Sequence, residues 1–179
     1  IGEKLSVSSL KVRNSNLENV LIIEPATIYE DFRGSYVETY NEDLYQEAGI
    51  DIKFVQDDVS TSAKNVLRGI HGDAETYKLI SCPYGRIYLV IVNCDTQSKN
   101  FGQWESFSLS APSKTQILAP PKHGVAHLVL SDVALFSYKQ STYYNRAGQF
   151  SYRYDDSRFG IFWPTRTPIL SERDSHAEG

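Results

Sequence analysis

Residues 78–92 read KLISCPYGRIYLVIV, and this stretch decides the fold class. Two runs of β-branched, aromatic and other apolar residues flank Pro83-Tyr84-Gly85, a sequence typical of turns. We therefore predict one strand over residues 78–82, a turn at Tyr84-Gly85 and a second strand over residues 86–92. If the turn closes a hairpin, the two strands pair with each other and Cys82 lies near Ile87.

The same pattern extends along the chain in both directions. Short apolar runs, several of them alternating at period two, recur between turn residues such as Ser131-Asp132. One helix is expected after Asn41, which can cap it, and before Gly49, which can end it. Many strands with little helix favour an all-β, antiparallel sandwich or barrel with a few short helices. The further predicted strands cover residues 20–23, 35–40, 54–56, 104–109, 115–118, 125–130 and 135–139.

The composition is that of an ordinary globular protein. The chain has 179 residues, of which 41% are hydrophobic and 22% charged, and one domain over residues 1–179 is expected. We expect no signal peptide and no membrane span, because no apolar run approaches the roughly 20 residues that cross a bilayer. The net charge of −4 offers no general attraction for nucleic acid. Cys82 and Cys94 have no CxxC spacing and are expected to be reduced and buried, which agrees with a cytoplasmic location.

The four histidines are considered one by one. His176 lies in the polar residues after position 174, which are expected to form a loose tail, and it is expected to be solvated. His123 and His127 have an even spacing that places both on one side of a strand, so a metal pair is conceivable. A metal site needs three or more ligands, however, and nothing adjacent completes one. For His127, whose neighbours on its face are valines, a hydrogen-bonded core histidine is favoured over a ligand.

His71 lies in a different setting, the segment NVLRGIHGD at residues 65–73. Arg68 precedes it by three positions, and glycines flank it, which suits an anion contact beside a base. Arginine and histidine at a strand end are also ordinary surface residues, so both interpretations stay open. Lys78 begins an apolar strand; such a lysine usually extends to solvent, but inside a pocket it stabilises a developing oxyanion.

Other motifs are absent or uninformative. The chain has 12 tyrosines, and most are expected to be packing residues, Tyr138 and Tyr144 included. There is no P-loop, no GxGxxG after a strand, no GxSxG and no HExxH. Nucleotide hydrolysis, dinucleotide redox chemistry, serine hydrolysis and zinc proteolysis therefore lose support.

Taken in order, several segments resemble the dTDP-4-dehydrorhamnose 3,5-epimerase family, which are cupin-type nucleotide-sugar epimerases. The resemblance runs from about Leu21 to Asp174. Each motif is weak alone, but their order is hard to obtain by chance. The motifs are Asp31-Phe32-Arg33-Gly34 with Glu38, Phe54-Val55-Gln56-Asp57, Asn65 to His71, Lys78-Leu79, Phe101-Gly102-Gln103-Trp104, Gly124-Val125-Ala126-His127, Tyr138-Lys139, Tyr143-Tyr144, Gly160-Ile161 with Trp163-Pro164, and Leu170 to Asp174.

The resemblance implies an antiparallel jelly-roll (cupin) barrel and an isomerase. The family inverts C3, C5 or both in a nucleotide-linked 4-keto-6-deoxy sugar, through an enolate, for deoxysugar or surface-polysaccharide biosynthesis. It implies no metal and no other cofactor. It also implies a homodimer in which the segment with Arg33 and Glu38 enters the partner's site.

The resemblance also assigns roles to residues of this chain. His71 matches the general base, and Asp174 the carboxylate that orients it. Tyr138 matches the acid on the opposite face of the sugar, and Lys78 the cation near the 4-keto oxygen. The matching substrate-binding residues are Arg33 and Arg68 at the pyrophosphate, Glu38 and Gln56 on the nucleotide side, His127 in the pocket, and Tyr144.

The chain departs from the family pattern at three places. His71-Gly72-Asp73 stands where the dTDP enzymes usually have His-Phe-Gln, Leu128 where Gly is common, and Asp58 where Asn is common. The Gly-Ile-His-Gly-Asp form resembles a branch that acts on other nucleotide sugars, including GDP-linked 4-keto-6-deoxy-heptoses. The expected substrate is therefore GDP- or dTDP-linked.

These residue types suit epimerisation next to a ketone. The 4-keto group acidifies the hydrogens at C3 and C5, and an imidazole is largely neutral at pH 7 and can accept one. A carboxylate fixes the imidazole tautomer, and a cation stabilises the enolate oxygen. A phenol then returns a proton from the opposite face. The alternatives are a metal-dependent cupin oxygenase or isomerase using His123, His127 and a carboxylate, and a sugar-binding cupin without catalysis.

Overall fold

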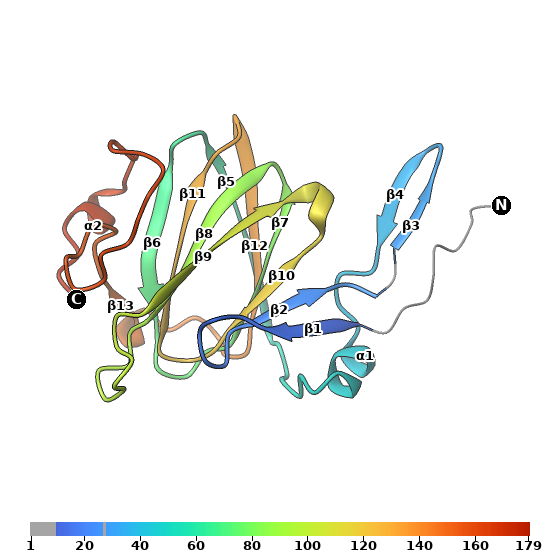
Figure 1. Ribbon diagram of the computed structural model, residues 1–179, viewed down its shortest axis with the longest axis horizontal. Helices are drawn as coiled ribbons and strands as arrows, with labels where there is room; N and C mark the ends of the chain where they lie inside the picture. Colours follow the sequence, from blue (N-terminus) through green and yellow to red (C-terminus); the bar gives the residue numbers. More distant parts are fainter. Residues whose placement is uncertain (1–9, 27) are drawn as a thin grey trace.

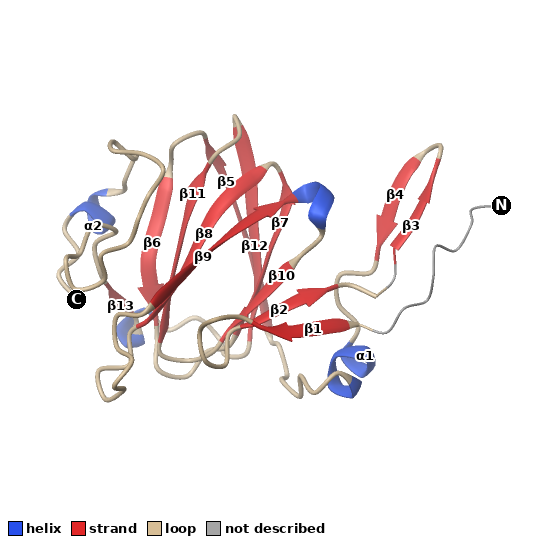
Figure 2. Cartoon of the chain, viewed as in Figure 1, coloured by secondary structure: helices blue, strands red, loops and turns tan. Residues whose placement is uncertain are grey.

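Two antiparallel β-sheets form the body of the molecule (Figure 1; Figure 2). The structure, a computed structural model, describes residues 10–26 and 28–179. The six-stranded sheet has the order β1 (Lys11–Asn14), β2 (Leu21–Glu24), β10 (Gln116–Ala119), β7 (Lys78–Tyr84), β12 (Val133–Gln140) and β5 (Gln56–Ala63). The five-stranded sheet has the order β13 (Phe150–Ser151), β6 (Leu67–Gly72), β11 (His123–Val129), β8 (Arg86–Asn93) and β9 (Trp104–Ser110).

The remaining elements are short. A separate hairpin of β3 (Ile28–Asp31) and β4 (Gly34–Val37) stands away from both sheets (Figure 1). The helices are α1 (Glu42–Glu47), α2 (Glu172–Ser175) and the 3₁₀ turns η1 (Ala111–Ser113) and η2 (Arg146–Gly148). In the described part of the chain, no helix is long and apolar enough to cross a membrane. The predicted all-β, antiparallel fold with a few short helices is confirmed. Residues 1–9, where the sequence predicts no signal peptide, lie outside the described residues.

The predicted helix forms where expected, because its two end signals work as read from the sequence. Asn41 is the N-cap, and its side chain accepts a hydrogen bond from the Leu44 amide at 3.2 Å. Gly49 follows the last turn with φ +92°, a left-handed conformation that favours glycine. Tyr45 is 2% exposed and packs this helix against the outer face of the six-stranded sheet.

The turn at Gly85 does not close a hairpin, which the sequence had left as a condition. The two strands that flank this residue lie in different sheets: β7 pairs with β10 and β12, whereas β8 pairs with β9 and β11. Gly85 has φ +80°, and a Cβ atom there would lie 2.3 Å from the Val133 carbonyl oxygen. The chain thus crosses between sheets at a tight corner, and the same holds between β11 and β12 at Ser131-Asp132. Turn residues predict a reversal, but they do not show which sheet receives the next strand.

Cys82 and Cys94 are both buried free cysteines, as predicted. They lie in different apolar clusters, one between the sheets and one beneath the C-terminal segment. Cys82 does not lie opposite Ile87 in a sheet, because these residues belong to β7 and β8.

Strands β5 and β6 were largely missed, and their composition explains why. β5 reads QDDVSTSA, and β6 reads LRGIHG, with two glycines. Neither has the apolar alternation on which strand prediction depends. In β5 the less exposed positions are polar, from Gln56 to Ser62, because that face is turned toward a cavity rather than an apolar core.

Within residues 10–26 and 28–179, three apolar clusters hold the layers together. The largest fills the space between the sheets, with Ile80 and Ile117 from one sheet and Leu89 and Ile91 from the other. A second lies on the outer face of the five-stranded sheet, beneath the C-terminal segment that includes Trp163. That segment wraps the sheet and ends in α2 beside β6 (Figure 1). This wrapping places residues from the end of the chain at the mouth of the space between the sheets.

Candidate active site

A cavity of about 490 Å³ opens between the two sheets. Its lining includes all four residues that the resemblance assigned to catalysis, and two of the predicted binding residues. Val125 and Phe136 belong both to this lining and to the apolar cluster between the sheets, so the cavity continues directly from the core. The predicted site residues that line it are His71, Lys78, Tyr138, Asp174, Arg68 and His127.

The half-buried His71 pairs with the buried Asp174 on the five-stranded side of the cavity. Nε2 of His71 lies 2.5 Å from Oδ1 of Asp174, and the Gly69 amide donates to Oδ2 at 3.2 Å. Burial alone would raise the pKa of Asp174, but the hydrogen bond and charge of His71 and the Gly69 amide outweigh it and hold the pKa below its ordinary value. The ionised carboxylate accepts from Nε2, which leaves Nδ1 as the nitrogen with the free lone pair.

Gly69 makes this arrangement possible. Its φ is +120°, and a Cβ atom would lie 2.4 Å from the Val125 carbonyl oxygen and 2.6 Å from Cβ of Ala126. Only glycine permits β6 to approach β11 this closely. The pairing between these strands is irregular here, with a register shift between Val125 and His127. The close approach sets the Gly69 amide against the Asp174 carboxylate.

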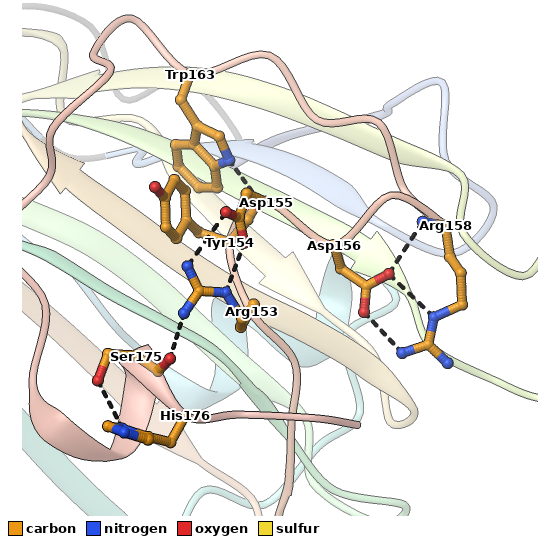
Figure 3. A network of polar contacts seen from close by, with 8 residues as sticks. All are labelled: Arg153, Tyr154, Asp155, Asp156, Arg158, Trp163, Ser175 and His176. Carbon is orange, nitrogen blue, oxygen red and sulfur yellow. Dashed lines mark hydrogen bonds and ion pairs between the residues drawn. The ribbon is translucent and has the colours of Figure 1, made fainter.

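Asp174 is carried by α2, which several polar contacts fix to the body. The Ser171 side chain caps this helix by accepting from the Asp174 amide at 3.1 Å. The Arg153 guanidinium donates to the Ser175 carbonyl oxygen and pairs with Asp155 at 2.8 Å (Figure 3). In the same network the Trp163 indole donates to the Tyr154 carbonyl oxygen at 2.7 Å, while Asp156 pairs with Arg158 (Figure 3).

This network corrects one sequence expectation. Residues after 174 were expected to form a loose tail, yet Ser175 belongs to α2 and its carbonyl is held by Arg153. His176 is exposed, as predicted, and its Nδ1 lies 2.9 Å from the Ser175 hydroxyl and from the Glu172 carbonyl oxygen. The last helix is therefore part of the site's support.

Tyr138 and Lys78 face the pair from the six-stranded sheet. They lie on the adjacent strands β12 and β7, and Nζ of Lys78 is 5.6 Å from the centre of the Tyr138 ring. Burial, with a further contribution from the charge of Asp58, raises the pKa of Tyr138 to about 12. Burial lowers the pKa of Lys78, while the carboxylates of Asp73 and Asp58 oppose that shift. The phenol is therefore a proton donor at neutral pH, and the lysine lies within the cavity rather than extending to solvent.

His127 is buried but not hydrogen-bonded as a core histidine was expected to be. It is 3% exposed and stacks on Phe136, with ring centres 4.0 Å apart and planes 10° apart. Its Nε2 is buried without a hydrogen-bond partner among the described residues. Burial, followed by the charges of Arg68 and His71, lowers the pKa of His127 to about 3, so the ring is neutral. A buried polar atom without a partner at a cavity wall is a place where a ligand group can bind.

Arg68 and Ser60 complete the polar wall, and the buried Ser62 holds Arg68. Nε of Arg68 donates to the Ser62 hydroxyl at 2.9 Å; no other described residue bonds to its guanidinium, which can therefore meet an anion. Ser60 lines the cavity, and its buried hydroxyl has no partner within the described part of the chain. Sequence reasoning missed both serines. The signal that could have revealed them is the polar alternation of residues 56, 58, 60 and 62.

Four predicted binding residues lie outside this cavity. Gln56 donates to Asp58 at 2.9 Å and accepts from the Tyr144 amide at 3.0 Å, and the Tyr144 side chain is 51% exposed. Arg33 is at the tip of the β3–β4 hairpin, where it pairs with Asp31 at 2.6 Å. Glu38 directly follows β4. The structure therefore does not bring Arg33 and Glu38 together with the site of their own chain.

The unusual Gly72-Asp73 sequence has a packing explanation. A Cβ atom at Gly72 would lie 2.5 Å from both the His123 carbonyl oxygen and the Phe150 ring, so the Phe150 ring occupies the space next to Gly72. The Asp73 carboxylate accepts from the Thr76 amide at 2.7 Å and from Nε2 of Gln149 at 3.0 Å. Both residues thus serve local structure around β13 and the loop before β7.

The metal-dependent alternative finds no ligand set in the described residues. No three His, Cys, Asp or Glu side chains gather in residues 10–26 and 28–179. His127 lines the cavity, whereas Nδ1 of His123 is 2.9 Å from the Pro121 carbonyl oxygen. The two histidines therefore do not act as a pair.

Comparisons with known proteins agree with this geometry. The sequence model of the dTDP-4-dehydrorhamnose 3,5-epimerase family matches residues 14–179. The enzyme of that name from Escherichia coli K12 is 38% identical over 170 residues, which cover 92% of this chain and 91% of the relative.

Two solved structures are also similar to this chain. A Legionella pneumophila dTDP-6-deoxy-D-glucose-3,5-epimerase in complex with dTDP-4-keto-L-rhamnose superimposes with a TM-score of 0.88 at 37% identity, over 94% of this chain and 91% of that one. A 3′-monoepimerase from Streptomyces bikiniensis in complex with dTDP-quinovose superimposes with a TM-score of 0.85 at 32% identity, over 91% of this chain and 84% of that one. The chain belongs to the dTDP-4-dehydrorhamnose 3,5-epimerase family.

Proposed function

We propose that this chain inverts C3, C5 or both of a nucleotide-linked 4-keto-6-deoxy sugar. The observation that supports this most strongly is the placement of His71 with Asp174 on one sheet and Tyr138 with Lys78 on the facing sheet of one cavity. A base and an acid on opposite walls are what inversion at a carbon requires. A sugar-binding protein without catalysis has no use for this arrangement.

The reaction follows from the positions of these groups. His71 takes the hydrogen next to the ketone as a proton, and the electron pair of the C–H bond moves into an enolate. Lys78 lies where its ammonium meets the enolate oxygen, and one preorganised donor of this kind contributes about 100- to 1,000-fold in rate. Tyr138 gives its phenolic proton to the same carbon from the other face. After one inversion His71 is protonated and Tyr138 is ionised. His71 then loses a proton to solvent and Tyr138 gains one before the next turnover.

Asp174 is the positioning partner of His71. Its carboxylate accepts from Nε2, so it fixes the tautomer with Nδ1 as the basic nitrogen and stabilises the imidazolium that forms. Both carboxylate oxygens are engaged, one by His71 and one by the Gly69 amide, so the pair is held before substrate arrives. The steps involve proton transfers alone, so they need no metal and no other cofactor.

The substrate is proposed to be dTDP-linked, as in the relatives. Arg68 is proposed to bind the pyrophosphate. Nε2 of His127, which has no partner among the described residues, is proposed to bind a polar group of the sugar. Gln56 and Tyr144 are proposed for the nucleotide side. A GDP-linked sugar is the alternative substrate; the contacts of Gly72 with Phe150 and of Asp73 with Gln149 give both residues a structural role that does not depend on the nucleotide.

The working unit is proposed to be a homodimer. The β3–β4 hairpin stands away from the body, and Phe32 at its tip is 98% exposed (Figure 1). A large apolar side chain on a protruding hairpin is typical of an interaction surface. Arg33 and Glu38 would then reach the partner's cavity.

We also propose that residues 1–179 act as one domain, and that the protein works in the cytoplasm, where buried free cysteines such as Cys82 and Cys94 persist.

Proton NMR in heavy water tests the proposed function. The protein is incubated with 4-keto-6-deoxy sugars linked to dTDP, GDP or CDP, and the signals of the C3 and C5 hydrogens are followed. We expect deuterium at C3, C5 or both of the dTDP-linked sugar, together with inversion. Efficient reaction of the GDP-linked sugar instead would overturn the nucleotide assignment, and no exchange with any of the three would overturn the epimerase function.

A further inference from the structure

One acidic residue beside the cavity, Asp58, has no part in the reaction described above. It lies on β5, directly across from Tyr138 of β12. Its Oδ2 accepts hydrogen bonds from Nε2 of Gln140 and Nε2 of Gln56, each at 2.9 Å. Gln140 is 2% exposed. Two amide donors therefore hold this carboxylate in place, and no Lys or Arg forms an ion pair with it among the described residues.

The same carboxylate is close to both donors on the six-stranded wall. The strands lie in the order β7, β12, β5. Gln140, which bonds to Asp58, is the direct cross-strand neighbour of Lys78, and Tyr138 is the direct neighbour of Asp58. Nζ of Lys78 is 5.6 Å from the Tyr138 ring centre. One negative charge is thus placed beside a phenol and an ammonium that face the same cavity.

We propose that Asp58 is a positioning residue that keeps both Tyr138 and Lys78 protonated. The inference rests on the proposed function, because a reaction that protonates an enolate carbon and neutralises an enolate oxygen needs the neutral phenol and the charged amine together. A negative charge disfavours loss of the proton from both, since phenolate is repelled and ammonium is attracted.

The directions of two pKa shifts support this assignment. For Tyr138, burial raises the pKa, and the charge of Asp58 and its hydrogen bond to the Tyr138 side chain raise it further. For Lys78, burial lowers the pKa, and Asp73 and Asp58 act against that loss. The other titratable or charged groups of the described residues that face this pair are Tyr144 after β12, His71 and Arg68 of β6, His127 of β11, and Arg173 and Asp174 of α2.

Asp73 differs from Asp58 in its surroundings. Its carboxylate accepts hydrogen bonds from the Glu75 amide and the Thr76 hydroxyl in the loop before β7, and from Nε2 of Gln149. It acts on Lys78 but is not among the groups that shift the pKa of Tyr138. Of these two acidic residues, only Asp58 acts on both donors.

The substitution Asp58→Asn removes the negative charge and keeps the size of the side chain. Its amide oxygen has two lone pairs and can accept from both Gln56 and Gln140, so the hydrogen-bond geometry is kept. The experiment measures the rate of inversion of the 4-keto-6-deoxy sugar from pH 6 to pH 10. We expect the fall in rate at alkaline pH to move down by about one pH unit, which is about a tenfold loss at the alkaline end. At pH 7 the rate should stay within about threefold of that of the unmodified protein.

Asp57→Asn is the matched control. Asp57 is the preceding residue on β5, but it points to the outer face, where it pairs with Lys139 at 3.1 Å and is 68% exposed. Its loss removes one charge from the same strand and should leave the profile unchanged. Asp58→Glu keeps the charge, so its rate of inversion should fall at the same alkaline pH as that of the unmodified protein. If Asp58→Asn does not fold, Asp58→Thr, which is neutral and suits a strand, replaces it.

The outcomes separate this inference from the proposed function. If the unmodified protein inverts the sugar and the pH profile of Asp58→Asn is identical to its own, the proposed role of Asp58 is overturned. A shift as large in Asp57→Asn would also overturn it, because a general charge effect would then suffice. Absence of inversion by the unmodified protein would instead overturn the proposed function.

Discussion

Nε2 of His71 lies 2.5 Å from Oδ1 of Asp174, although the two residues are 103 positions apart in the sequence. Their meeting depends on the C-terminal segment, which wraps the five-stranded sheet and returns through α2 to β6. The carboxylate is 3% exposed and has its second oxygen on the Gly69 amide. The site is therefore complete on this wall only when the end of the chain is in place.

Asp174→Asn tests whether this pairing serves catalysis. The amide cannot stabilise an imidazolium and can present an N–H to Nε2, which would favour the wrong tautomer. We expect kcat to fall about 100-fold or more, with KM changed little, because Asp174 acts through His71. Steady-state kinetics and a circular dichroism spectrum check this. An activity within a few-fold of the unmodified protein would contradict the positioning role.

Asp174 should also contribute a pH-dependent part of the stability. Its pKa is lowered in the folded protein, so the contribution is present above the unfolded value near 3.9 and is lost as the pH falls through the folded value. Urea unfolding of the unmodified protein and of Asp174→Asn should therefore differ most above about pH 4 and converge below it. A difference that grows as the pH falls below 4 would show the opposite sign.

Tyr138→Phe separates proton removal from inversion. The ring stays, but the donor on the second wall is lost, so His71 can still form the enolate and return a proton to the same face. We expect inversion to slow about 100-fold or more, while deuterium still enters with retention of configuration. NMR in heavy water measures both rates on one sample. Equal losses of exchange and inversion would make Tyr138 a positioning group rather than the acid.

Gly72→Ala tests the packing explanation of the His71-Gly72-Asp73 sequence. The new methyl group would meet the His123 carbonyl oxygen and the Phe150 ring at 2.5 Å. Overpacking of this kind costs about 1–3 kcal/mol in the free energy of unfolding. Gly148→Ala is the control, because its nearest neighbour would lie at an ordinary 3.6 Å. If both variants unfold at the same denaturant concentration as the unmodified protein, the explanation is wrong.

Mixing two inactive variants tests the proposed exchange of Arg33 between subunits. Arg33→Glu keeps its own His71, and His71→Ala keeps its own Arg33. In a random mixture of dimers, about a quarter of the sites would combine His71 of one chain with Arg33 of the other and recover activity. No recovery after unfolding and refolding the mixture together, with dimers present, would show that Arg33 does not act across the interface.

Much of the site could be predicted from the sequence, because its motifs are short and local. Arg68, His71 and Lys78 stand out as polar residues beside apolar strands, and all three line the cavity. Asp174 could be assigned only through the resemblance, since nothing in the last residues shows that α2 returns to β6. The outcome at His127 was mixed: its burial was predicted, but not the missing partner of Nε2.

What the sequence could not show concerns long-range placement. Gly85 was read as a turn that could close a hairpin, but it joins two sheets, because the choice of partner strand depends on the packing of the whole barrel. β5 was missed because its inner face is polar, and a polar inner face makes sense only once the cavity is known. Asp58 stood out from the sequence only as a departure from the family pattern, because its neighbours Gln140 and Tyr138 lie some eighty positions away, on β12.

The central claim is that the His71 imidazole removes the hydrogen next to the ketone. The direct test compares the unmodified protein with His71→Ala in heavy water, with a dTDP-linked 4-keto-6-deoxy sugar, and follows the C3 and C5 hydrogens by NMR. We predict that the substitution lowers exchange at both carbons by about 100-fold or more while the protein stays folded. Exchange at the unmodified rate in folded His71→Ala would show that another group is the base and would contradict the account.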